Sequence, residues 1–85
     1  MPQKDREIAL LREELEMLMS ERQALLRVAG ASAVLVANMD SKRLPVGAIE
    51  SADLVATTIN DLAEETLQDA LAAVNAEIEE DSAAA

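Results

Sequence analysis

Apolar and small residues recur at alternating intervals of three and four positions from Ile8 to Met39. This stripe consists of Ile8, Leu11, Leu15, Leu18, Arg22, Leu25, Ala29, Ser32, Val36 and Met39. An average interval of about 3.5 residues keeps a stripe on one face of a helix that wraps around a neighbouring helix. The pattern therefore predicts one long amphipathic helix over residues 4–40.

The second half of this helix, residues 24–39, is apolar on nearly every face. Its polar residues are Arg27, Ser32 and Asn38. Because a helix that is apolar all round is surrounded by protein, this segment is expected in the core of a bundle. Small residues gather at its centre, namely Ala29, Gly30, Ala31, Ala33 and Ala37. Small residues let another backbone approach closely, so they favour a tight helix crossing or a groove for a partner helix.

Residues 41–50 carry the signals of a turn. Leu44 precedes Pro45 and is thereby pushed out of the α region, and Gly47 adds backbone freedom. Ser51 is then the expected N-cap of a second helix. A connection of this length suits two antiparallel helices.

A second helix is expected over residues 51–80, and its apolar stripe has two readings. The first slips in phase and consists of Ala52, Val55, Ile59, Leu62 and Thr66, then Leu67, Leu71, Val74 and Ile78. The second is straight, relies on alanines and consists of Ala56, Ile59, Ala63, Leu67, Ala70, Val74 and Ile78. The slip indicates a kink or break near Asn60 and Asp61, and we favour one helix that bends there. Residues 82–85 are expected to form a disordered tail.

Together these elements predict an all-α helical hairpin that forms one domain over residues 1–81. Two helices packed only on each other leave segment 24–39 half exposed, and chains this small are marginal even with a full core. We therefore expect a homodimer, arranged as a four-helix bundle or a coiled coil, with the two chains parallel or antiparallel. The expected oligomer interface consists of Ile8, Leu11, Leu15, Leu18, Arg22, Leu25, Ala29, Ala33 and Val36.

Arg22 occupies a stripe position where an aliphatic residue is expected. In one reading the seam ends at Arg22, or its long side chain reaches outward and pairs with a carboxylate. In the other reading it is a buried polar position that fixes orientation and oligomer state at a cost in stability, with Glu21, Glu65 or Asp69 as its partner.

The formal net charge of −10 belongs entirely to the second half of the chain. All seven Lys and Arg residues lie at or before Arg43, and an equal number of Asp and Glu residues balances them there. Charge of one sign in one segment favours a basic partner, although it also serves solubility. In an antiparallel hairpin, the acids of residues 77–81 are expected beside the cations of residues 4–12. The remaining acids are the candidate partner-binding residues, namely Glu50, Asp53, Asp61, Glu64, Glu65 and Asp69.

Several residue types that carry chemistry are missing from the chain. It contains no His, Cys, Phe, Tyr or Trp. Imidazole and thiolate metal sites, Cys nucleophiles and His bases are therefore excluded, as is aromatic stacking on single-stranded nucleic acid. The clustered carboxylates lack a loop that would organise their oxygens around a cation. No metal, other cofactor or enzymatic activity is expected.

The location of the protein follows from its apolar and charged segments. The most apolar window, residues 24–39, is too short and too polar to span a bilayer. The densely charged segment 1–16 is unlike a secretory signal. We therefore expect a cytoplasmic protein of bacterial or phage type that does not enter a membrane.

Three classes of function fit these observations. The first is a small adaptor or inhibitor that binds a protein through its acidic helix or its small-residue groove. The second is a structural coiled-coil oligomer or assembly chaperone, and the third is an acidic mimic of nucleic acid that occupies a DNA-binding protein. Direct binding of nucleic acid is disfavoured, because it requires a net positive face for the phosphates.

Overall fold

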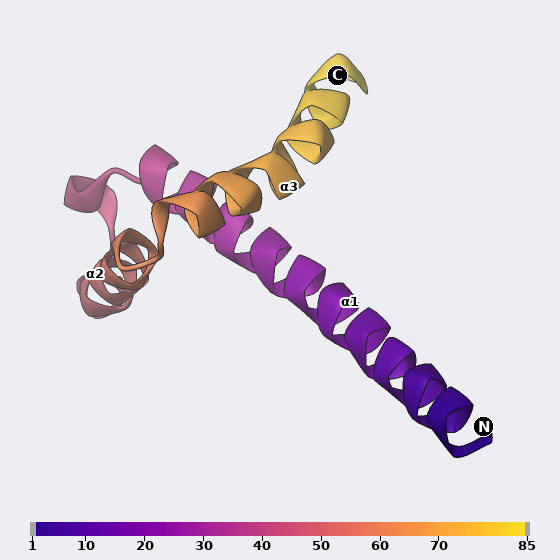
Figure 1. Cartoon of the computed structure of the whole chain (residues 1–85). Coiled ribbons are helices and arrows are strands. Elements are labelled where there is room, and N and C mark those ends of the chain that lie inside the picture. The colour runs from indigo at the N-terminus through magenta and orange to yellow at the C-terminus, as the bar shows by residue number, and fades with distance from the viewer. Residues whose placement is uncertain (1, 85) are drawn as a thin grey trace.

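The structure is a computed structural model that describes the backbone of residues 2–84 and the side chains of residues 2–75. It consists of α1 (Pro2–Asn38), a 3-10 turn η1 (Ser41–Arg43), α2 (Val46–Asn60) and α3 (Glu64–Ala84). The described residues contain no strand, so the predicted all-α class is confirmed. Figure 1 shows α1 as a long straight rod, with α2 and α3 folded back against its C-terminal half.

α1 begins and ends two residues earlier than predicted. Its first residue is Pro2, at a position where a helix does not need the N–H that proline lacks. At the other end, the side-chain amide of Asn38 donates a 2.9 Å hydrogen bond to the carbonyl of Val34. The chain then turns at Asp40, whose carboxylate accepts a 3.0 Å hydrogen bond from the backbone N–H of Lys42. These local bonds end α1 and start η1.

α2 begins at Val46, so the predicted start at Ser51 is wrong and the connection is shorter than residues 41–50. Pro45 stands directly before the helix, and its carbonyl accepts a 2.9 Å hydrogen bond from the backbone N–H of Ala48. Gly47 lies inside the helix with a negative φ. Proline suits the start of a helix because its φ is already near the helical value. The Pro-Val-Gly segment therefore starts a helix and does not prolong the turn.

The second half of the chain forms two helices, where we favoured a single bent one. α2 ends at Asn60 and α3 begins at Glu64, so the break lies where the slip in the stripe indicated. The backbone N–H of Leu62 donates a 3.1 Å bond to the carbonyl of Ile59, one residue closer than in an α-helix. This tighter last turn ends α2 and lets the chain change direction.

α3 continues to Ala84, so residues 82–84 of the predicted disordered tail are helical. The high helix propensity of alanine accounts for this extension. Ala85 lies outside the described residues.

α3 crosses α1 near Gly30, and a small core lies at this crossing. Leu26 of α1, with Ala70 and Val74 of α3, are the buried apolar side chains in the part of the chain whose side chains are described. A Cβ built on Gly30 would run into the carbonyl oxygen of Ala70 and would lie 3.0 Å from a methyl carbon of Val74. The missing side chain therefore lets the two helix backbones touch.

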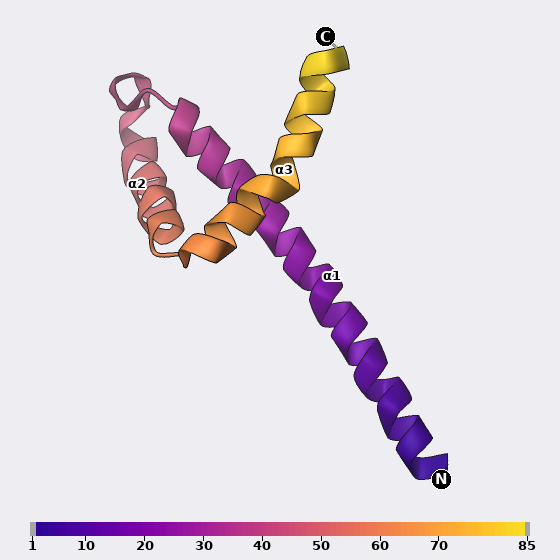
Figure 2. The ribbon, with the colours of Figure 1, turned by 45° about the horizontal axis from the view of Figure 1, so that its top comes forward.

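The N-terminal half of α1 extends beyond the rest of the molecule. Figures 1 and 2 show no other helix beside residues 2–21, which we call the arm. The molecule measures 65 × 33 × 22 Å, and its radius of gyration is 18.3 Å. A compact chain of this length has a radius of gyration of about 12 Å. The elongation therefore comes from an arm on which no other described helix packs.

The free end of the arm and the C-terminal end of α3 point apart in both views (Figures 1 and 2). The predicted proximity of residues 4–12 to residues 77–81 is therefore wrong. α3 crosses α1 obliquely at the small-residue patch of α1, which consists of Ala29, Gly30, Ala31, Ala33 and Ala37. Helices that cross at an angle separate on either side of the contact. The side chains of residues 77–81 lie outside the described residues.

Candidate functional site

The apolar stripe is open to solvent along the arm and for one turn beyond it. Its members are each more than half exposed, and they are Ile8, Leu11, Leu15, Leu18 and Leu25. We call this set the exposed stripe. It stays on one face of α1 because the residues are three, four or seven positions apart. A row of large aliphatic side chains on a bare helix is an interaction surface rather than a core.

The upper part of the predicted interface lies against the chain's own helices. Ala29, Ala33 and Val36 are half-buried. Ala33 lines a cleft together with Leu67 of α3, and Val36 lines the junction of α1 with α2. The part of the predicted interface that a partner can reach without moving α2 or α3 therefore runs from Ile8 to Leu25.

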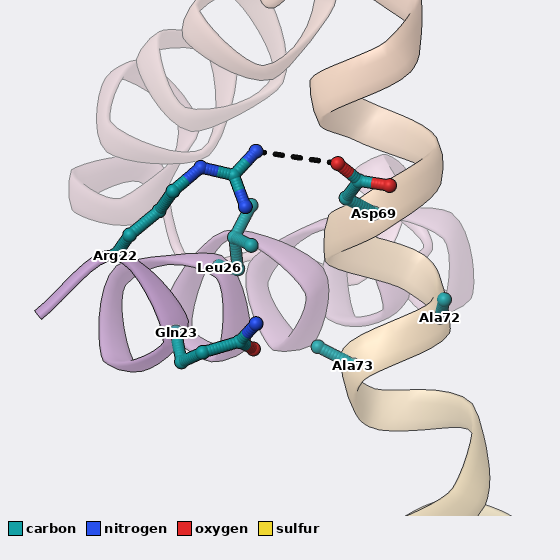
Figure 3. Close-up of a pocket in the computed structure, with 6 residues that line it drawn as sticks. All are labelled: Arg22, Gln23, Leu26, Asp69, Ala72 and Ala73. Atoms are coloured by element: carbon teal, nitrogen blue, oxygen red, sulfur yellow. Dashed lines mark hydrogen bonds and ion pairs between the residues drawn. The ribbon is translucent and has the colours of Figure 1, made fainter. Parts of the chain in front are cut away.

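Arg22 lies at the upper end of the exposed stripe and reaches sideways to α3. Its Nη2 lies 3.2 Å from Oδ2 of Asp69, and the two side chains are 54% and 56% exposed. Figure 3 shows the guanidinium group pointing at this carboxylate across the gap between the helices. The predicted pairing of Arg22 with an acid of the second half is therefore found, with Asp69 as the acid.

Beneath this ion pair lies an open cleft of about 400 Å³ between α1 and α3. Gln23, Leu26, Ala72 and Ala73 line it together with the two charged residues (Figure 3). Since both charged side chains are more than half exposed, the cleft offers a bound molecule little separation from water. It suits the edge of a helix contact better than the enclosure of a substrate.

The six candidate acids do not form one surface. Glu50 and Asp53 lie on α2, and Asp53 lines the junction of α2 with the end of α1. Asp61 is the C-cap of α2, and Glu64 and Glu65 form the first turn of α3. Carboxylates in a first turn complement the positive end of the helix dipole. With Asp69 paired to Arg22, the carboxylates of Glu50, Asp53 and Asp61 are the candidates to which the fold gives no evident structural role.

The small-residue patch of α1 is occupied within the chain. α3 lies on Gly30 so closely that even a methyl group there would meet the backbone of Ala70. Of the two roles that the sequence left open for this patch, the structure uses it for a tight crossing.

Sequence reasoning missed a second set of exposed aliphatic residues on α1. It consists of Leu10, Met17, Val28 and Leu35, each more than half exposed. At 3.6 residues per turn these residues share a face roughly opposite Gly30, so α3 does not cover them. The seven-residue spacing within each half of the set was a signal that could have found them.

The described part of the chain holds no group of three or more carboxylates placed to bind a metal ion. None of the helices, over those same residues, has both the length and the apolar character needed to cross a bilayer. Comparisons with protein-family models, curated proteins and solved structures found no match to this chain. Among the described residues, the exposed stripe is therefore the feature that bears most directly on function.

Proposed function

We propose that the chain is a non-enzymatic assembly module whose arm pairs with the arm of a second copy to form a homodimeric coiled coil. The observation that carries the proposal is the exposed stripe, four of whose five aliphatic side chains stand on the arm, with no other helix beside them. A lone amphipathic helix of this length is marginal in water, and it becomes stable when its apolar face is covered. A second copy supplies an identical stripe and the commonest symmetry, a two-fold axis.

The arrangement of the other helices favours a coiled coil of arms over a four-helix bundle. α2 and α3 lie at the C-terminal half of α1, and neither runs beside the arm (Figure 2). In such a dimer α2, α3 and the C-terminal half of α1 lie outside the coiled coil, and we call this part of each chain the head. The heads would carry Glu50 and Asp53 at the surface, where a basic protein partner could reach them.

The proposal is tested by placing charges in the stripe. Leu11→Glu with Leu18→Glu would put four carboxylates into the apolar seam of a dimer, where the cation of the stripe, Arg22, already pairs with Asp69. The matched control is Ala9→Glu with Ser20→Glu, which adds the same charge on the outer face of the arm. Sedimentation equilibrium at micromolar concentration measures the mass of each protein.

We expect the wild type and the control to have twice the 9.1 kDa mass of one chain. The stripe variant should have the mass of a monomer and should lose helix content in far-ultraviolet circular dichroism, because its arm has no partner. A wild-type protein that sediments as a monomer at these concentrations would rule out the proposal.

A further inference from the structure

One flank of the exposed stripe carries only acids, whereas the other flank carries the cation Arg12. In a heptad register with Ile8 and Leu15 at a and Leu11 and Leu18 at d, one flank is the g position and the other is the e position. The g positions are all acidic, and they are Glu7, Glu14 and Glu21. The e positions of the arm are Asp5, Arg12 and Met19. All of these side chains are exposed, so a partner helix would meet them directly.

An antiparallel pairing of two arms brings like charges together. In that orientation g faces g and e faces e across the seam. The register that buries the first four aliphatic residues of the exposed stripe places Glu14 opposite its own copy and Glu7 opposite Glu21. It also places Arg12 opposite its own copy. Like charges that face each other across a helix pair are destabilising.

A parallel pairing in register removes these conflicts. Each g residue then faces the e residue five positions later on the partner. Glu7 faces Arg12 on both sides of the dimer, and Glu14 covers Met19, whose side chain is otherwise exposed. The charge pattern of the arm is therefore complementary to a second copy of itself in the parallel orientation.

The Arg22–Asp69 ion pair fits the upper end of such a coil. In a parallel dimer Arg22, at an a position, would face its own copy, and the nearby carboxylate of Asp69 at 3.2 Å offsets the charge of each cation. Gly30, on which α3 packs, lies about 140° around α1 from Leu25. α3 also covers Leu26, which is an e residue, so each head lies beside the upper end of the seam and leaves the seam of the arm open.

We infer that the arms pair parallel and in register, so that the two heads lie at the same end of the coiled coil. This inference rests on the proposed function, because it names the orientation of the dimer that the exposed stripe forms. Parallel pairing places both heads next to each other at one end of the coiled coil, whereas antiparallel pairing would place them at opposite ends.

The chain contains no cysteine, so a single introduced thiol reports the orientation directly. In a parallel dimer every d residue faces its own copy, and Leu11→Cys and Leu18→Cys should each form a covalent dimer in a glutathione redox buffer. In the antiparallel register described above, neither residue faces itself. Ser20→Cys places the thiol on the outer face of the arm and serves as the control. Cross-linking is read on a non-reducing gel, and the mass of each reduced variant is read by sedimentation.

Covalent dimers of both stripe variants, with a monomeric control band, are the expected result. If both variants sediment as dimers and neither cross-links, parallel pairing is overturned and the proposed dimer stands. If the wild-type protein sediments as a monomer, both proposals fail.

A charge exchange tests the same orientation without altering the apolar stripe. Arg12→Glu turns two attractions of the parallel dimer into repulsions and should weaken dimerisation about tenfold. Adding Glu7→Arg to it restores opposite charges across the seam and should recover most of the lost affinity. Arg6→Glu, on the outer face, makes the same change in net charge and should leave dimerisation nearly unchanged. Failure of the double exchange to recover affinity would contradict parallel pairing.

Discussion

Gly30 and Ala70 bring the backbones of α1 and α3 into direct contact. A Cβ on Gly30 would lie 2.8 Å from the carbonyl carbon of Ala70, a distance that side-chain rearrangement cannot relieve because the obstacle is backbone. Ala70 is fully buried, and Val74 and Leu26 close the contact on either side. The chain's small core therefore depends on the absence of one side chain.

Gly30→Ala should destabilise the protein even though alanine is the better helix former. The substitution gains about 1 kcal/mol of helix propensity. Forcing α3 away from α1 costs about 1–3 kcal/mol by overpacking and also opens the core around Val74. We expect a lower midpoint of thermal unfolding, measured by circular dichroism.

Gly47 provides the matched control for this substitution. It also lies within a helix, but a Cβ there would meet nothing within 4 Å. Gly47→Ala should therefore keep or raise the unfolding midpoint. Equal effects at the two glycines would show that the close approach at Gly30 does not govern stability.

Much of this architecture could be predicted from the sequence, because it depends on local pattern. The three-and-four spacing predicted α1 to within two residues, and the slip in the second stripe marked the break after Asn60. Arg22 was predicted to pair with a carboxylate, and Asp69 was one of three candidates, because an arginine in an apolar stripe needs a partner. Each of these inferences uses information that lies within a few residues along one helix.

The features that escaped prediction depend on how the helices cross. The sequence indicated that Gly30 permits a close approach, but it did not identify α3 as the helix that makes it. Ala70, the most buried side chain described, appears in only one of the two readings of the second stripe. The proximity of residues 4–12 to 77–81 was inferred from an antiparallel hairpin, and the oblique crossing separates those segments. The angle between two helices is set by side-chain packing over their whole contact, which single-helix periodicity does not encode.

The acids at the start of α3 should contribute to stability rather than only to surface charge. Glu64 and Glu65 lie in its first turn, where each carboxylate stabilises the helix by about 0.3–1 kcal/mol. Replacing both with Gln should lower the unfolding midpoint at low ionic strength, and the difference should shrink in high salt as the charges are screened. Glu50→Gln with Asp53→Asn removes the same charge from α2 and should have little effect. A larger loss from the α2 pair would mean that these acids hold the fold together.

Arg22→Leu should strengthen the dimer and broaden the distribution of oligomeric states. The exposed pair with Asp69 is worth at most about 1 kcal/mol, whereas burying a leucine in the seam contributes about 1.5–3 kcal/mol. The unfolding midpoint should therefore rise. Because a polar residue in the stripe also restricts register, sedimentation velocity should show a broader distribution of oligomers. Arg22→Gln removes the charge without adding an apolar layer and should not raise the midpoint. A more stable protein that still sediments as one species would contradict a role of Arg22 in register.

The unfolding midpoint of the wild type should depend on protein concentration. Only three of the described side chains are apolar and buried. No other described helix packs on the arm, and the radius of gyration of 18.3 Å reflects this elongation. If pairing of the arms supplies the missing burial, mass action couples folding to association. A tenfold increase in concentration should then raise the midpoint by roughly 4 °C. The monomeric Leu11→Glu, Leu18→Glu variant should show a lower midpoint that does not change with concentration. A wild-type midpoint that stays constant over a hundredfold range would mean that each chain folds alone and that its exposed stripe contributes nothing to stability.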